Sequence, residues 1–216
     1  MKIKIATITA VFVFVGMCGF ASAYTIGYDY ALEGSNNYTS NYTGAIVETF
    51  DTTTPLWNWT GSFNIVSGSV SGQYAAPFGV SSADSTYYVT VPTGQSSGFA
   101  DVSLGATYNY FGIWWGSVDD YNTLSFYKNG SEVASFGGSS IAPPADGNQV
   151  SNSTNLYVNL YDLPDFDAFR MTSTSYAFEA DNIAVGTAPV PEPSTILLLG
   201  SGLLGLGWYG RKRKKA

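Results

Sequence analysis

Residues 123–136 have the sequence TLSFYKNGSEVASF. Two runs of strand-forming residues flank the dipeptide Asn129-Gly130. Asn and Gly accept the positive φ that both turn positions of a two-residue hairpin require. The stretch therefore predicts two antiparallel strands, at residues 123–128 and 131–136.

The residues around this hairpin extend the same pattern. Turn residues recur about every eight to twelve positions, Tyr, Phe, Val, Thr and Ser are abundant, and apolar residues show no helical spacing. Further strands are predicted at 46–50, at 64–70 with a break at Gly68, at 86–91 and at 176–185. The pattern is typical of an all-β sandwich or barrel.

The segment with most aromatic residues is FGIWWGSVDDYN, residues 111–122. On a strand, Phe111, Ile113 and Trp115 share one face, while Trp114 lies on the other. Aromatic rings beside amides and carboxylates suit carbohydrate stacking, and the alternative is that the rings fill a core while Asp and Asn cap a turn. The candidate carbohydrate-binding residues are Trp114, Trp115, Tyr121, Asp119 and Asn122.

The charge of the chain is unevenly distributed. Residues 24–190 contain fifteen acidic residues against two basic ones, Lys128 and Arg170, for a net charge of −13. Such a surface repels phosphate backbones, so we expect no nucleic-acid partner. The acidity indicates either cation binding or solubility outside the cell.

The chain has no histidine, and its one cysteine is Cys18. Ser-His-Asp and Cys-His catalysis and the usual zinc sites are therefore excluded. A glycosidase needs only two carboxylates, and acidic residues do cluster. Since adjacent acids are typical of solvated turns, we expect no enzyme, and a glycoside hydrolase is the third alternative. The clustered acids are Asp119, Asp120, Asp162, Asp165 and Asp167.

The first 23 residues have the pattern of a secretory signal peptide. Lys2 and Lys4 precede an apolar run, which ends at the small residues Ala21-Ser22-Ala23. The run is short for a membrane span. The sequence predicts a signal peptide at 1–23 and an extracellular β-sandwich domain at 24–188.

The other end of the chain has three parts. A proline motif, VPEPS at 190–194, precedes an uncharged Leu/Gly-rich segment and the basic run RKRKK at 211–215. Residues 189–216 thus resemble the PEP-CTERM sorting signal. The resemblance implies a hydrophobic sorting helix, transient anchoring in the inner membrane, processing by exosortase, and delivery to the cell surface or medium of bacteria that make extracellular polysaccharide. The residues that carry the signal are Pro191, Glu192, Pro193, Arg211, Lys212 and Arg213.

A second resemblance covers most of the domain. Residues 115–124, the hairpin and the stretch AFEADNI at 177–183 are similar to small β-rich exosortase-dependent surface proteins and to the closing strand of jelly-roll modules. The resemblance implies a jelly-roll-like β-sandwich without catalytic residues. Jelly-roll modules hold calcium between an early and the last strand, which implies a candidate site at Glu48, Asp51 and Asp181.

We therefore expect an exported protein with a structural or adhesive role in an exopolysaccharide or biofilm matrix. The main alternative is a carbohydrate-binding module, stabilised by calcium or free of cofactors. The expected partners are exosortase, the inner membrane and extracellular polysaccharide.

Overall fold

The computed structural model describes residues 25–29 and 38–187, and all structural statements concern these residues. The predicted signal peptide and the predicted sorting segment lie outside them. The described chain folds as β-strands with one short helix, α1 (Gly138–Ile141), and no helix in it is long and apolar enough to cross a membrane. The strands are β1 (Thr25–Asp29), β2 (Ile46–Glu48), β3 (Asn58–Gly61), β4 (Asn64–Ser67), β5 (Tyr87–Val91), β6 (Gly98–Tyr108), β7 (Tyr110–Gly116), β8 (Asn122–Lys128), β9 (Ser131–Gly137), β10 (Leu156–Tyr161), β11 (Phe166–Ser173) and β12 (Phe178–Gly186).

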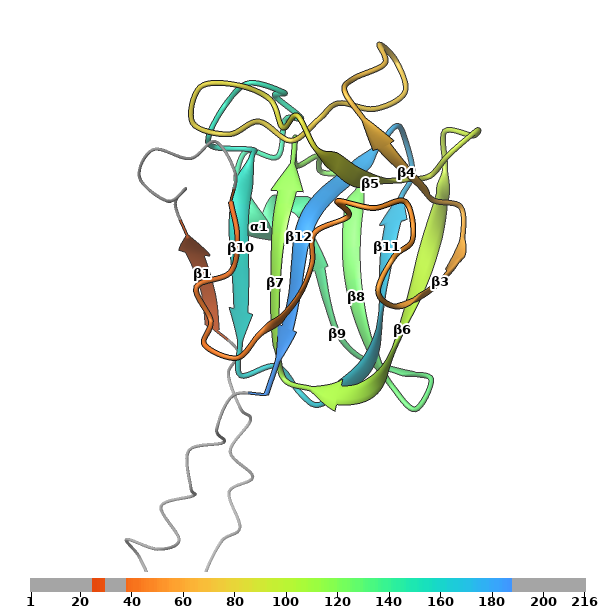
Figure 1. The fold of residues 1–216 in the computed structure, drawn as a ribbon, viewed down its shortest axis with the longest axis vertical. Helices are drawn as coiled ribbons and strands as arrows, with labels where there is room; N and C mark the ends of the chain where they lie inside the picture. Colours follow the sequence, from red (N-terminus) through yellow and green to blue (C-terminus); the bar gives the residue numbers. More distant parts are fainter. Residues whose placement is uncertain (1–24, 30–37, 188–216) are drawn as a thin grey trace, which may run out of the picture.

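The strands form two antiparallel sheets that pack as a sandwich (Figure 1). The seven-stranded sheet has the order β1-β10-β7-β12-β5-β4, and β2 also pairs with β12. The five-stranded sheet has the order β3-β6-β11-β8-β9. The predicted all-β sandwich is confirmed.

The predicted hairpin is confirmed as β8 and β9. Asn129 and Gly130 have φ values of 50° and 79°, so both turn positions are left-handed, as the tight turn requires. The strand predicted at 46–50 ends earlier, at Glu48, because Phe50 has a φ of 51° and leaves the strand conformation. The strand predicted at 64–70 ends at Ser67, just before Gly68 with its φ of 69°.

Three long strands, β6, β10 and β11, lie outside the predicted set. Strand β6 alternates well, but its inward residues Ala100, Val102 and Leu104 are small, and its outward residues are mixed. Strand β11 is interrupted by a register shift between Phe166 and Ala168, which breaks the period of two. Weak side-chain contrast and a bulge therefore hide these strands from a pattern based on alternation.

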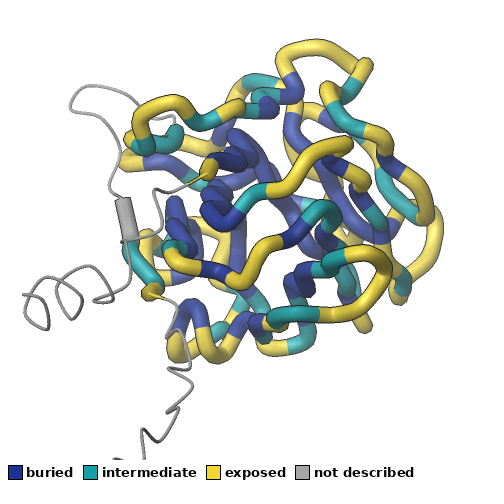
Figure 2. The backbone as a smooth tube through the Cα atoms, turned by 90° about the horizontal axis from the view of Figure 1, so that it is seen from below, coloured by how far each residue is buried: buried dark blue, intermediate teal, exposed yellow. Residues whose placement is uncertain are grey.

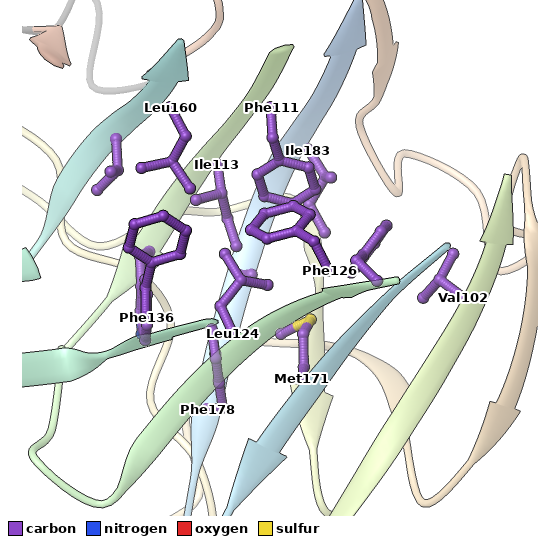
Figure 3. Packing of buried hydrophobic residues seen from close by; sticks show 14 of the residues in the cluster. Val102, Phe111, Ile113, Leu124, Phe126, Phe136, Leu160, Met171, Phe178 and Ile183 are labelled. Carbon is purple, nitrogen blue, oxygen red and sulfur yellow. The ribbon is translucent and has the colours of Figure 1, made fainter. Parts of the chain in front are cut away.

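The core lies between the sheets and is rich in aromatic rings (Figure 3). Phe111 and Phe126 meet edge to face with ring centroids 5.0 Å apart, and Phe111 meets Phe169 at the same distance. Trp115 stacks on Phe178 at 4.2 Å. The predicted inward face of Phe111, Ile113 and Trp115 is confirmed, and Figure 2 shows buried chain inside a rim of exposed loops.

The seven-stranded sheet is buried on its outer face as well. Every residue of β7 is buried, and Trp114 packs there against Tyr38 with ring centroids 5.2 Å apart. Tyr42 stacks on Tyr110 at 4.0 Å, so the segment from residue 38 onward covers this face, as the orange trace crossing β7 and β12 shows in Figure 1. A Cβ on Gly112 would lie 2.6 Å from the Tyr157 hydroxyl, which explains the glycine. The outer face of the five-stranded sheet, by contrast, carries exposed residues.

Candidate functional site

The two tryptophans of the predicted carbohydrate platform are fully buried. Trp115 lies in the inter-sheet core against Phe178, and Trp114 lies beneath Tyr38 on the outer face of the other sheet. A sugar needs an accessible ring face to stack on an aromatic side chain. Neither indole offers one, so these two rings do not form the expected platform. They fill the core, which is the alternative that the sequence left open.

The polar members of the predicted platform hold loops together. The buried Asn122 donates from Nδ2 to the Ala177 carbonyl at 3.0 Å and accepts from Ser173 Oγ at 2.6 Å. The Tyr121 hydroxyl donates to the Tyr176 carbonyl at 2.6 Å. These bonds tie the start of β8 to the turn that precedes β12.

Asp119 is enclosed by the loop that follows α1. A Cβ on Gly147 would lie 2.1 Å from Asp119 Oδ1, and one on Gly138 would lie 1.9 Å from the Asp119 carbonyl oxygen. Burial raises the pKa of the Asp119 carboxyl, while its hydrogen bond with Tyr121 lowers it. Asp119 is therefore packed beneath two glycines, and we assign it a structural role.

The acids predicted to hold calcium do not form one cluster. Glu48 accepts backbone N–H bonds from Phe50, at 3.0 Å, and from Leu56, so its carboxylate caps the loop after β2. The exposed Asp51 accepts a 2.7 Å bond from Thr49. Within residues 25–29 and 38–187, no group of three or more acidic, histidine or cysteine side chains is arranged to hold a metal. Asp181 lies instead beside Asp84, which the sequence analysis missed.

The acids considered for catalysis have other roles. The Asp167 carboxylate lies 3.3 Å from Lys128 Nζ and accepts the Asn129 N–H at 3.1 Å. The Asn129 N–H, followed by Lys128, lowers the pKa of Asp167. Asp167 thus anchors the β8–β9 hairpin, while Asp120, Asp162 and Asp165 are exposed.

The outer face of the five-stranded sheet is the surface with ligand-binding character. In register, Arg170 of β11 lies between Asp101 of β6 and Ser125 of β8. Its guanidinium donates from Nε and Nη2 to the two Asp101 carboxylate oxygens at 2.6 and 2.8 Å. This fork raises the pKa of Arg170. The pair fixes a planar polar group in the middle of an exposed sheet.

Two aromatic rings flank this guanidinium. The Arg170 Cζ lies 4.1 Å from the centre of the Phe99 ring and 5.6 Å from that of the Tyr127 ring. Phe99 is 43% exposed, which is unusual for so large an apolar side chain in the middle of a strand. The rings and the ion pair together form a rigid, amphipathic surface.

A groove of about 280 Å³ lies beside the ion pair. Ala168 is paired in register with Ser103 on one side and Tyr127 on the other. Because Ala168 and Ser103 are small and Tyr127 and Arg170 are large, the face is hollow at this point. The groove is lined by Asn58, Thr60, Asp101, Val102, Ser103, Tyr127, Gly130, Ala168 and Arg170. Sequence alternation on β6 and β11 was the signal that would have found it.

A second cavity, of about 290 Å³, borders the buried Glu179. The Glu179 carboxylate accepts the Ala75 N–H at 2.8 Å and the Ser117 hydroxyl at 3.1 Å. Burial, with a smaller contribution from Asp119, raises its pKa to about 8. Since both oxygens bind structural donors, we interpret this carboxyl as a clamp on the loop that contains Ala75.

Comparison with known proteins identifies one part of the chain. Residues 189–214 match the family model described as the PEP-CTERM protein-sorting motif. The comparison with curated proteins found no match.

Two solved structures are similar in fold. One is the CBM32 of AlyQ in complex with 4,5-unsaturated mannuronic acid, at 15% identity and a TM-score of 0.29, covering 47% of this chain and 78% of that chain. The other is an exo-1,3/1,4-β-glucanase (ExoP) from a Pseudoalteromonas species, at 12% identity and a TM-score of 0.36, covering 71% of this chain and 22% of that chain. These scores carry no argument about ligands, which has to come from the site itself.

Proposed function

We propose that the β-sandwich of this PEP-CTERM, exosortase-dependent exported protein binds extracellular polysaccharide in the groove on the five-stranded sheet. After transient anchoring in the inner membrane and processing by exosortase, the domain is held in the exopolysaccharide matrix by this contact. The protein thereby serves as an adhesive matrix component.

The observation that carries the proposal is the groove beside Arg170. Its lining offers hydroxyl, amide, carboxylate and guanidinium groups together with the ring of Tyr127. Sugar hydroxyls both donate and accept, so they pair well with such a mixed set. The polar groups are held in place by strands, which lowers the entropy cost of ordering them on binding.

The charge of the domain favours a neutral glycan. Asp101 neutralises Arg170, so the groove has no free positive charge with which to attract a polyanion. The surrounding domain has a net charge of −13, from fifteen acidic and two basic residues, and repels polyanions at long range. We therefore expect neutral polysaccharides to bind more tightly than uronate-rich or sulfated ones.

The proposal includes no catalysis. The lack of histidine and the structural contacts of Asp119, Asp167 and Glu179 support this view. The groove itself contains a single carboxylate, Asp101, and glycoside cleavage requires two.

Filling the groove provides a direct test. The variant Ala168→Phe adds a ring at the bottom of the groove and removes no polar group. We expect it to lower affinity for a bound neutral glycan by about tenfold or more, equivalent to roughly 1.4 kcal/mol. Binding is measured on a glycan array and then by titration, using the full chain in mild detergent.

The matched control is Thr172→Phe, which adds the same ring on the same strand and face, outside the groove. It should bind as the wild type does, and both variants should unfold near the wild-type temperature. Equal binding by Ala168→Phe and Thr172→Phe would place the site elsewhere, and a wild type that binds no glycan would overturn the proposal.

A further inference from the structure

Two carboxyl groups meet on the covered outer face of the seven-stranded sheet. Asp181 lies on β12 opposite Trp114 of β7, and its side chain is fully buried. Asp84 lies in the loop before β5 and is 8% exposed. The loop is held in place by the Asp84 N–H, which donates to the Pro77 carbonyl at 2.8 Å. The two carboxyl groups lie within hydrogen-bonding reach of each other.

Each carboxyl group is oriented by donors on one oxygen only. Asp84 Oδ1 accepts the Thr86 N–H at 2.9 Å and the Thr86 hydroxyl at 2.7 Å. Asp181 Oδ1 accepts the Asn182 N–H at 2.7 Å. The Oδ2 atoms of both residues are buried, and no donor among the described residues reaches them. The arrangement leaves two carboxylate oxygens facing a shared space without a partner.

No protein cation compensates this pair. The basic residues of the described chain are Lys128 and Arg170, and both bind acids on the five-stranded sheet. Burial, and then the neighbouring Asp84, raise the pKa of Asp181, and Asp51 adds to the effect. Buried polar groups are nearly always satisfied in folded proteins, so this pair requires either a shared proton or a bound cation.

We propose that Asp84 and Asp181 bind a calcium ion that fastens the loop before β5 to β12. The N–H and O–H donors on both Oδ1 atoms favour ionised carboxylates, which a cation uses and a shared proton does not need. Carboxylate oxygens suit a hard cation, and calcium accepts irregular sites completed by backbone carbonyls and water. An exported protein also meets calcium outside the cell. This site replaces the predicted one, because Glu48 caps its own loop.

Thermal unfolding of the full chain in mild detergent tests the site. Extracellular modules bind calcium with dissociation constants of about 10⁻⁴ to 10⁻³ M, so we expect the unfolding temperature to rise by about 3 to 10 °C between EDTA and about 10 mM calcium. Asp84→Asn should fold, since its amide can donate to Asp181, and it should lose this rise. The control Asp165→Asn removes an exposed acid and should keep it.

Terbium provides a second measurement that needs no variant. Because Trp114 is paired in register with Asp181, excitation of tryptophan should sensitise emission from terbium bound in the calcium site, and calcium should displace it. An unfolding temperature that ignores calcium, together with no terbium emission, would overturn the proposal in favour of a shared proton. A calcium response that survives Asp84→Asn would also overturn it, because the ion would then bind elsewhere. Glycan binding by the five-stranded sheet is measured independently, so either proposal can fail alone.

Discussion

Glu179→Gln should remove a large part of the stability that the protein loses between pH 4.5 and about pH 8. Burial raises the pKa of Glu179 from 4.5 to about 8 in the folded state. The neutral carboxyl therefore contributes its full stability below pH 4.5, and this contribution is lost as pH rises toward 8. A shift of this size corresponds to on the order of 4 kcal/mol.

Glutamine is a suitable replacement because both contacts can be kept. Its Oε1 can accept the Ala75 N–H, and its Nε2 can donate to the Ser117 hydroxyl. Urea unfolding at several pH values, with Asp165→Asn as the exposed control, measures the effect. We expect the variant to be more stable than the wild type at about pH 8 and the advantage to shrink as the pH falls to 4.5. Parallel curves over this range would contradict the assignment.

Trp115→Ala should lower the free energy of unfolding by about 3 to 5 kcal/mol, the range for removing a large aromatic ring from a core. The indole is fully buried and stacks on Phe178 at 4.2 Å. Chemical denaturation measures the loss. The control Val150→Ala shortens a side chain that is 67% exposed, and its stability should change by less than about 0.5 kcal/mol.

The same variant separates the two interpretations of the tryptophan pair. A core residue changes stability first, whereas a binding residue changes affinity at constant stability. A Trp115→Ala variant that unfolds like the wild type but no longer binds glycan would restore the carbohydrate platform that the sequence suggested.

Parts of the fold that depend on neighbouring residues were predictable. The Asn129-Gly130 turn places β8 beside β9 because two adjacent residues both accept positive φ. The alternation of Phe111, Ile113 and Trp115 identified an inward face because side chains on a strand change sides at every residue. Alternation cannot distinguish a solvent-facing side from one covered by another segment, which is why Trp114 was taken as a candidate for sugar binding.

The candidate sites combine residues from distant parts of the chain. Arg170 and Asp101 are 69 residues apart and meet only because β11 pairs with β6. Asp84 meets Asp181 only because the loop before β5 folds over β12. The calcium prediction found Asp181 correctly as an acid on the last strand but paired it with Glu48, whose carboxylate turned out to bind its own loop.

The sequence by itself determined the export and sorting route, the all-β class, the central hairpin and the exclusion of histidine and zinc chemistry, because these depend on composition or on short contiguous motifs. The tertiary structure alone decided which sheet face stays open, where the groove lies and which acids are buried together. These features depend on strand pairing and on the segment that covers the seven-stranded sheet, and the free energy of burying that face is distributed over residues far apart in the chain.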